Sequence, residues 1–325
     1  MTGVDITIVL PVYGRSDLLE PALESVVKQT SHNWELLVAD DGSDKATRNF
    51  IEGWISRHKN ERITWLQRPQ NLGLFGNLNQ AISEASTEWI MLLCSDDVLL
   101  PSATERVDNL CRMWPEAWIT LSTFESINRD GTCRPADNAW HHDQIERRTA
   151  VVEAKDMVQA LLRLGSVNGN LTGMAFRKSL WKQAGPFRED WTHAADWEWL
   201  VRAVCISPVI LNREPIARVR THELQLSNSN RENGNEIREV AAVVRQLIDH
   251  PLLAGEKRRH KWAAHIMHFQ MWNTAKVFRT LSKRELLLRM ELISVSAGLR
   301  MTLVALLSYV PIRIKKTILG TRRSL

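Results

Sequence analysis

The chain of 325 residues lacks the sequence patterns that define several large classes of protein. Its four cysteines have no CxxC spacing, which argues against a disulfide framework or a zinc site and fits free thiols in a reducing compartment. It has no GxGxxG or Walker A motif, no amino-terminal signal peptide and no internal repeat. No apolar run reaches the roughly 20 residues that a membrane-spanning helix needs. We therefore expect a cytoplasmic globular protein, and nucleic acid is not among its expected partners.

Basic residues are concentrated toward the carboxyl terminus. Residues 256–325 contain 15 Lys and Arg against three Asp and Glu, although the whole chain has a net charge of only +5. This region also has helical spacing of its apolar residues, most clearly at 286–293 and 299–310. A basic, amphipathic helical region suits the interface of an anionic membrane, whereas the alternative is a helical cap or a dimer contact. We predict a first domain over residues 1–235 and this helical region over 236–325.

Short apolar runs alternate with helical patterns along the first hundred residues. The runs cover residues 6–10, 35–39, 63–66 and 89–93, and each has the length of a buried strand. Amphipathic helical patterns lie between them, as at residues 16–27. This alternation predicts an α/β fold with a mostly parallel sheet that helices cover on both faces.

Two of these runs end in paired carboxylates. Asp40-Asp41 follows the second run, and Asp96-Asp97 follows the fourth. The carboxyl ends of parallel strands form one edge of a sheet, and open α/β folds bind their ligands there. Adjacent carboxylates are costly to bury unless something positive lies between them, and a divalent cation with a diphosphate is a common solution. The alternative is that each pair only caps a turn or the next helix.

Six segments of the chain carry, in order, a recognisable set of motifs. They are Leu10-Pro11-Val12-Tyr13, Val38-Ala39-Asp40-Asp41-Gly42-Ser43, Asn71-Leu72-Gly73-Leu74 with Asn79, Ser95-Asp96-Asp97 with Pro101, residues 184–190 followed by 195–202, and Arg220-Thr221-His222 with Leu226-Ser227. This order resembles the family 2 inverting glycosyltransferases of the GT-A fold, of the type that builds bacterial polysaccharides such as the O-antigen of lipopolysaccharide. The resemblance covers roughly residues 4 to 230.

The resemblance implies a nucleotide-sugar donor and either Mg²⁺ or Mn²⁺ as cofactor. It implies that Asp96, Asp97 and His222 hold the metal, which suits hard cations because they prefer oxygen ligands. Tyr13 would pack on the base, and Asp40 would accept its imide N–H. The nucleotide-binding positions that the resemblance implies are Pro11, Tyr13, Asp40, Asp41, Asn71, Gly73, Asn79 and Asp96.

The resemblance also implies an acceptor hydroxyl on a glycan or a lipid-linked saccharide, and a place for the enzyme on the inner face of the cell membrane. Asp196 would be the general base that takes the hydroxyl proton while the oxygen attacks the anomeric carbon with inversion. As a helix cap, Asp196 would have no part in the reaction. The acceptor or diphosphate side would include Glu189, Asp190, Trp197 and Arg220.

The chain departs from the family pattern at two positions. Cys94 stands where the metal segment often begins with an acid, and Leu78 stands where an Arg often precedes the Asn of the third segment.

Two other function classes stay open. A sugar nucleotidyltransferase should have a Gly-rich, basic loop after its first strand, and Pro11-Val12-Tyr13-Gly14 is not such a loop. A non-catalytic carbohydrate-binding relative would have lost catalytic residues, yet Asp97, Asp196 and His222 are present.

Overall fold

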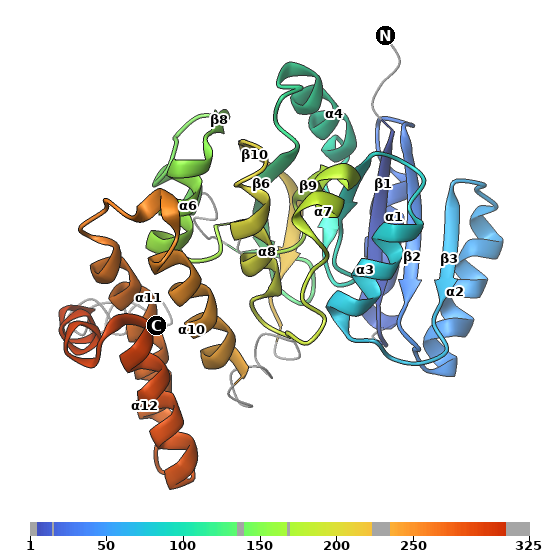
Figure 1. Cartoon of the computed structure of the whole chain (residues 1–325). Helices are drawn as coiled ribbons and strands as arrows, with labels where there is room; N and C mark the ends of the chain where they lie inside the picture. Colours follow the sequence, from blue (N-terminus) through green and yellow to red (C-terminus); the bar gives the residue numbers. More distant parts are fainter. Residues whose placement is uncertain (1–4, 15, 135–139, 168–169, 223–234, 310–325) are drawn as a thin grey trace, which may run out of the picture. The chain divides into compact units, whose positions relative to one another are not determined.

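A computed structural model describes residues 5–14, 16–134, 140–167, 170–222 and 235–309 (Figure 1). The chain divides into two compact units. The first comprises residues 1–157 and 166–229, and the second comprises residues 158–165 and 230–325. The second unit therefore begins a few residues before the boundary predicted at 236, and it also includes part of helix α6 (Ala154–Leu164).

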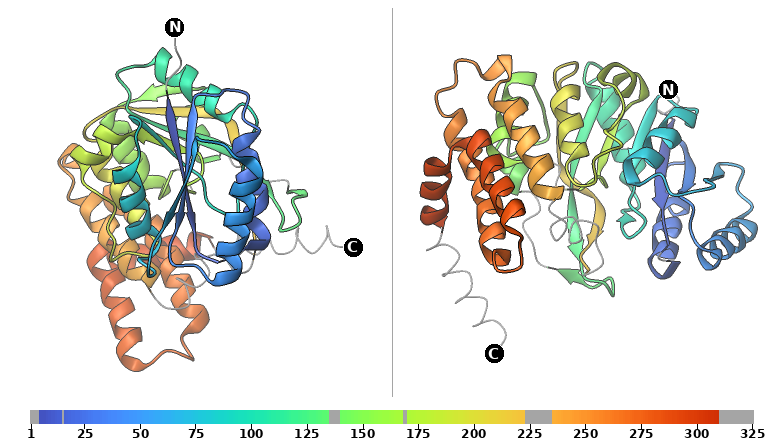
Figure 2. Two further views of the ribbon diagram at one scale, coloured as in Figure 1. Left: turned by 90° about the vertical axis from the view of Figure 1, so that its right-hand side faces the viewer. Right: turned by 60° about the horizontal axis from the view of Figure 1, so that its bottom comes forward.

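The first unit is built around a ten-stranded sheet with helices on both faces (Figure 2). Its strand order is β3-β2-β1-β4-β9-β6-β10-β5, with β7 paired to β6 and β8 paired to β10. The strands are β1 (Ile6–Val12), β2 (Trp34–Asp40), β3 (Ile63–Gln67), β4 (Trp89–Leu92), β5 (Val98–Leu99), β6 (Ile119–Ile127), β7 (Cys133–Arg134), β8 (Ala150–Val152), β9 (Met174–Arg177) and β10 (Val209–Arg220). The described helices that lie wholly within this unit are α1 (Ser16–Val27), α2 (Lys45–His58), α3 (Leu74–Glu84), α4 (Ala103–Met113), α5 (Trp140–Asp143), α7 (Lys178–Ala184) and α8 (Ala195–Ala203).

The predicted α/β fold is confirmed, and the second half of the sheet adds a mixed pairing pattern. β3, β2, β1 and β4 are parallel neighbours, as the alternation of strands and helices predicts. β9 then runs antiparallel to both β4 and β6, while β10 is parallel to β6. The reversed direction of β9 brings its amino end to the edge where β4 and β6 end.

The apolar composition of the first strand explains its place in the middle of the sheet. Every residue of β1 is buried, as expected of a strand that helices cover on both faces. Pro11 is tolerated because the pairing with β4 ends at Val9 and Leu92, so the missing N–H of Pro11 leaves no gap in that ladder. Ile6, Ile8, Leu10 and Val12 of β1 form a core together with apolar residues of α1 and β2.

The second unit contains α10 (Asn235–Ile248), a short 3₁₀ helix (Pro251–Leu253), α11 (Arg259–Val277), α12 (Lys283–Ala297) and a last helix, Leu299–Tyr309. The Ser282 hydroxyl begins α12 by accepting the N–H of Glu285 at 3.1 Å, which is an N-cap hydrogen bond. The predicted carboxyl-terminal helical region is therefore confirmed. Among the described residues, no single helix is long and apolar enough to cross a membrane, although α12 and the last helix, bent by 94° at their junction, pass that test as a pair.

Candidate active site

The carboxyl ends of β1, β2 and β4 lie at one edge of the sheet because these strands are parallel neighbours. The antiparallel strand β9 begins at this edge, and β10 ends at it. The edge thus collects residues that are far apart in sequence, and the candidate site lies along it. These residues are Tyr13, Asp40, Asp97, Thr172 and His222.

Asp97 connects three segments of this edge. Its side chain is 1% exposed, and its Oδ2 accepts hydrogen bonds from Thr172 Oγ1 at 2.6 Å and Asn170 Nδ2 at 3.1 Å. Its Oδ1 accepts the main-chain N–H of Arg220 at 2.8 Å. Burial raises the pKa of Asp97 to about 7, and the charge of Asp96 acts in the same direction, whereas the three hydrogen bonds lower this pKa. The acidic motif is therefore fixed to the loop before β9 and to the end of β10.

Asp96 is held next to a histidine and an arginine from the end of β10. Its Oδ2 lies 2.9 Å from Nε2 of the buried His222. Arg220 Nε donates to the main-chain oxygen of Asp96 at 2.8 Å, and Arg220 Nη1 donates to the carbonyl oxygens of Asn128 (3.2 Å) and Arg129 (2.6 Å). These contacts join main-chain groups of the acidic motif and of the β6–β7 turn. The placement of Arg220 on the acceptor or diphosphate side stays a prediction.

The acidic motif also forms a group of possible metal ligands. Cys94 Sγ and carboxylate oxygens of Asp96 and Asp97 all lie within 4.8 Å of one another. Carboxylate oxygens suit a hard cation such as Mg²⁺ or Mn²⁺, and His222 lies beside them. Burial, followed by the charges of Asp97 and Asp96, raises the pKa of Cys94 well above its usual value, so this thiol is protonated. The two carboxylates therefore fit a hard divalent cation, and the neutral thiol is a weaker candidate ligand.

Tyr13 follows the last residue of β1, and Asp40 is the last residue of the neighbouring strand β2. The Tyr13 side chain is 62% exposed, and Asp40 pairs in the sheet with Val12, the residue before Tyr13. Asp40 is buried, with Oδ1 accepting the N–H of Ser43 at 2.9 Å and Oδ2 lying 3.4 Å from Nε of Arg48. An exposed aromatic ring can pack on a flat base, whereas the buried Asp40 carboxylate is held by Ser43 and Arg48.

Asp41 orders the turn that starts α3. Its Oδ1 accepts the N–H of Leu72 at 2.7 Å, and the N–H of Gly73 also bonds to it, while burial raises its pKa. Asn71 Oδ1 accepts the N–H of Gly73 at 2.9 Å. Gly42 must be glycine, because its φ is +74° and a Cβ there would lie 2.9 Å from the carbonyl carbon of Gln70. These contacts give Asp41 and Asn71, both predicted to bind the nucleotide, a role in shaping the turn.

Asn79 fastens α3 to the segment 184–190. Its Nδ2 donates to the main-chain oxygen of Phe187 at 2.8 Å and to Glu189 Oε1 at 3.0 Å, and its Oδ1 accepts the N–H of Phe187 at 2.9 Å. Both N–H groups of this amide are therefore used within the protein. Asn79 was predicted to contact the nucleotide, and in the structure it positions the predicted acceptor-side segment.

Helix α8 holds the same segment from its other side. Arg202 donates to the main-chain oxygens of Ala184, Gly185 and Pro186, and Trp199 Nε1 donates to that of Gly185 at 3.0 Å. Asp196 lies half-buried in the first turn of α8. The helix that carries the predicted general base is thus tied to the predicted acceptor-side segment.

The remaining predicted residues have varied surroundings. The side chains of Pro11 and Trp197 are buried. Glu189 is exposed apart from its bond to Asn79, and Asp190 is exposed with its Oδ1 3.6 Å from Nε of Arg188. Leu226 and Ser227 of the last motif lie outside the described residues.

Several residues of the site have no signature in the family motifs. Asn170 and Thr172 lie just before β9, and no family motif indicates their contact with Asp97. Arg48 next to Asp40 could not be found by any pattern. Arg202 ends the motif segment 195–202, but the motif did not indicate its contacts with the segment 184–186. Each of these residues contacts a predicted site residue or segment that lies on another part of the chain.

Comparison with known proteins identifies a family model that matches part of the chain. Residues 7–111 match the family model described as glycosyl transferase family 2. A relative from Escherichia coli, the UDP-Glc:alpha-D-GlcNAc-diphosphoundecaprenol beta-1,3-glucosyltransferase WfgD, is 34% identical over 100 residues, which are 31% of this chain and 38% of that protein. The matched segments span only 20% to 38% of the lengths of the first three curated relatives.

Solved structures match over nearly the whole chain. TarS from S. aureus has been solved with UDP and with UDP-GlcNAc. Its UDP complex aligns with this chain with a TM-score of 0.67 and 15% identity, over 92% of this chain and 82% of that one. A mannosyltransferase from Pyrobaculum calidifontis, in complex with GDP-Man and Mn²⁺, has a TM-score of 0.56 and 15% identity over 98% and 88% of the two chains. Identities at this level show a shared fold. The chain therefore has the GT-A fold, and its residues 7–111 resemble the family 2 glycosyltransferases.

Proposed function

We propose that the protein transfers a sugar from a nucleotide-sugar donor to a hydroxyl of a saccharide acceptor, with inversion at the anomeric carbon. The observation that carries this proposal is the grouping of Asp96, Asp97 and His222 at the sheet edge where the exposed Tyr13 and the buried Asp40 also lie. A nucleoside diphosphate needs a flat surface for its base, an acceptor for a base N–H, and cation ligands near its phosphates. The fold of TarS, solved with UDP and UDP-GlcNAc, supports a donor of this class.

The proposed cofactor is Mg²⁺ or Mn²⁺, held by Asp96 and Asp97 with His222 beside them. A bound divalent cation acts as a Lewis acid and neutralises charge on a departing diphosphate. The residues around it keep the carboxylates in place, since Thr172, Asn170 and the N–H of Arg220 fix both oxygens of Asp97. The Mn²⁺ in the complex of the structurally similar mannosyltransferase supports a divalent cation in this fold.

Asp196 is the general base in this proposal. It lies at the start of a helix that Arg202 and Trp199 fasten to the segment 184–186, so its main chain has little freedom to move. A carboxylate positioned in this way takes the proton of the acceptor hydroxyl as the oxygen attacks. Because the attack comes from the face opposite the leaving diphosphate, the anomeric carbon is inverted in one step.

We further propose a glycan or lipid-linked saccharide as the acceptor, with the protein acting at the cytoplasmic face of the cell membrane in the synthesis of a bacterial polysaccharide such as lipopolysaccharide. The name of the E. coli relative describes a GlcNAc-diphosphoundecaprenol acceptor, which supports a lipid-linked class. The exposed carboxylates of Glu189 and Asp190, on the segment held by Asn79 and Arg202, are available to bind acceptor hydroxyls.

Substitution of Asp196 by asparagine tests the proposal. A panel of nucleotide sugars with Mn²⁺ and saccharide acceptors first identifies the substrates, by release of nucleoside diphosphate and by the product formed. Asp196→Asn should then lower turnover by about 10²- to 10⁴-fold with unchanged donor affinity and melting temperature. Asp156→Asn is the matched control, because Asp156 is an exposed residue in the first turn of α6.

Two results would contradict the proposal. Normal turnover in a stable Asp196→Asn protein would remove Asp196 from the mechanism and assign it a helix-capping role. Formation of nucleotide sugars from sugar phosphates would identify a nucleotidyltransferase, and saccharide binding without any transfer would identify a binding protein.

A further inference from the structure

The helices of the second unit bury polar side chains. Gln270 on α11 donates to Glu236 on α10 over 2.7 Å, and both residues are buried. Arg289 on α12 is also buried, with its Nε 3.0 Å from Oε1 of Glu285. Thr274 is buried with its hydroxyl bonded to the main-chain oxygen of Gln270 at 2.8 Å. The interior of this unit therefore combines apolar side chains with a few polar ones that are paired.

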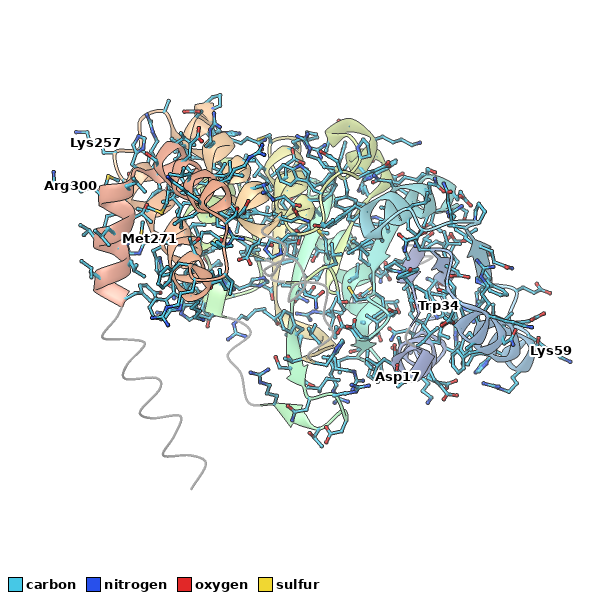
Figure 3. All side chains as sticks on the ribbon, turned by 90° about the horizontal axis from the view of Figure 1, so that it is seen from below. Asp17, Trp34, Lys59, Lys257, Met271 and Arg300 are labelled. Carbon is cyan, nitrogen blue, oxygen red and sulfur yellow. The ribbon has the colours of Figure 1, made fainter. Side chains whose placement is uncertain are left out.

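The last helix, Leu299–Tyr309, buries small side chains and exposes large apolar ones. Thr302 and Ala305, two of its smaller side chains, are buried. Arg300, labelled in Figure 3, is the only charged residue in the helix. A helix in water normally buries its large apolar residues and exposes polar ones, so this outward face is suited to an apolar environment. The large apolar side chains that it exposes are Leu299, Met301, Leu303, Val304 and Leu307.

The connection between α11 and α12 is an exposed tip that combines aromatic and basic side chains. Residues 276–284 contain four basic residues and no acidic residue. Val277 and Phe278 are exposed, and the Arg279 guanidinium lies 5.7 Å from the centre of the Phe278 ring. Aromatic and basic side chains together are typical of protein segments at the interface of an anionic membrane.

We propose that the outward face of the last helix and the tip at 276–284 dock onto the surface of an anionic lipid bilayer. Apolar side chains enter the headgroup region, and the basic side chains of the tip meet anionic headgroups. The last helix is too short to span the hydrocarbon core, and its 94° bend from α12 favours a helix that lies in the interface.

The distribution of charge distinguishes a bilayer from a second copy of the chain. A symmetric dimer through the tip would bring together four basic residues from each copy, and like charges repel. The sequence after the last helix adds Arg313, Lys315, Lys316, Arg322 and Arg323 without an acidic residue. An anionic surface complements all of these charges. The inference concerns the second unit alone and does not depend on the proposed transferase activity.

Flotation of the full-length protein with lipid vesicles tests the inference. Wild type should float with vesicles of phosphatidylcholine and phosphatidylglycerol and much less with phosphatidylcholine alone. Val304→Asn with Leu307→Asn replaces side chains that are 61% and 60% exposed, and it should weaken partition by at least about tenfold without lowering the melting temperature. Met113→Asn is the matched control, because Met113 is similarly exposed on α4 of the first unit.

A second pair of variants tests the charges. Arg279→Gln with Lys283→Gln should weaken partition into anionic vesicles by about 25-fold, since each basic residue near such a surface contributes about a fivefold factor. Arg147→Gln with Lys155→Gln removes two exposed basic residues of the first unit and should leave partition unchanged.

Three results would overturn the inference. The first is wild type that stays with the soluble fraction at all lipid compositions. The second is a lipid-free dimer in analytical ultracentrifugation that Val304→Asn with Leu307→Asn dissociates, which would assign the face to a second copy. The third is a clear loss of melting temperature in that variant, which would assign these side chains to packing within the protein.

Discussion

Replacement of Asn79 by alanine should loosen the segment 184–190 and destabilise the first unit. The Asn79 side chain is 5% exposed and makes three hydrogen bonds, of 2.8, 3.0 and 2.9 Å, to Phe187 and Glu189. The alanine variant leaves the N–H and the carbonyl of Phe187 without these partners in a buried position. Each lost bond of this kind costs about 1 kcal/mol, and an unsatisfied buried group adds to that cost, so we expect a loss of about 3 kcal/mol in the free energy of unfolding.

Asn77 on the same helix provides a matched control. It is also buried, and its Nδ2 donates to the main-chain oxygen of Ala39 at 2.7 Å. Asn77→Ala should therefore destabilise the protein by about 1 kcal/mol without touching the segment 184–190. Urea unfolding followed by tryptophan fluorescence measures the global effect. Hydrogen exchange measures the local one, and peptides over 184–190 should exchange faster in Asn79→Ala than in Asn77→Ala.

The nucleotide gives the decisive readout. If Asn79 only positions the segment, the affinity for the donor's nucleoside diphosphate should change by less than about threefold in Asn79→Ala, while turnover falls because Glu189 and its neighbours lose their support. A stable Asn79→Ala protein with normal exchange at 184–190 and greatly weakened nucleotide binding would refute this reasoning. It would return Asn79 to the nucleotide-contacting role that the motif implies.

Three further predictions concern single positions. Burial lowers the pKa of His142 from its usual 6.5 to about 4, so the folded protein should lose stability as the pH falls from 6.5 toward 4. Urea unfolding should show a loss of about 3 kcal/mol over this range in wild type, and His142→Gln should not show this pH-dependent loss. Gly42→Ala should destabilise by more than about 2 kcal/mol because its Cβ meets the Gln70 main chain, whereas Gly14→Ala, at φ +65° in open space, should cost about 1 kcal/mol in the same assay. Asp97→Ala should abolish the effect of EDTA on nucleoside-diphosphate affinity in calorimetry, and equal EDTA sensitivity in both proteins would contradict its role as a metal ligand.

The sequence predicted the first half of the sheet because the information there is local. Apolar runs of strand length alternate with amphipathic patterns, and β1, β2, β3 and β4 follow directly from that alternation. The position of β9 is different. Its partners, β4 and β6, come from segments far from it in sequence, and nothing within residues 174–177 specifies an antiparallel insertion between them. Long-range pairing of this kind depends on the whole fold.

The candidate site shows the same division. Asp96, Asp97 and His222 were predicted from motifs, and the structure brings Asp96 within 2.9 Å of His222. The contacts that hold these residues were not predicted, because the Thr172 hydroxyl, which lies 2.6 Å from Asp97, belongs to a segment 75 residues away along the chain. Motifs indicate which side chains meet a ligand, whereas the supporting hydrogen bonds follow from the packing of neighbouring elements.

Cys94 alters the electrostatics of the acidic motif. With Asp96 as its one acidic neighbour in that group, buried Asp97 already has a pKa raised to about 7, and a third carboxylate within 4.8 Å would raise the cost of ionisation further. The Cys94 thiol stays neutral, and its Sγ lies 3.6 Å from Oδ1 of Asn170, the same oxygen that accepts the N–H of Thr172. Cysteine at this position therefore removes one possible hard ligand and instead contacts the loop that fixes Asp97. Two carboxylates then suffice if the phosphate oxygens of the donor complete the coordination of the cation, as is usual for Mg²⁺ at nucleotide sites.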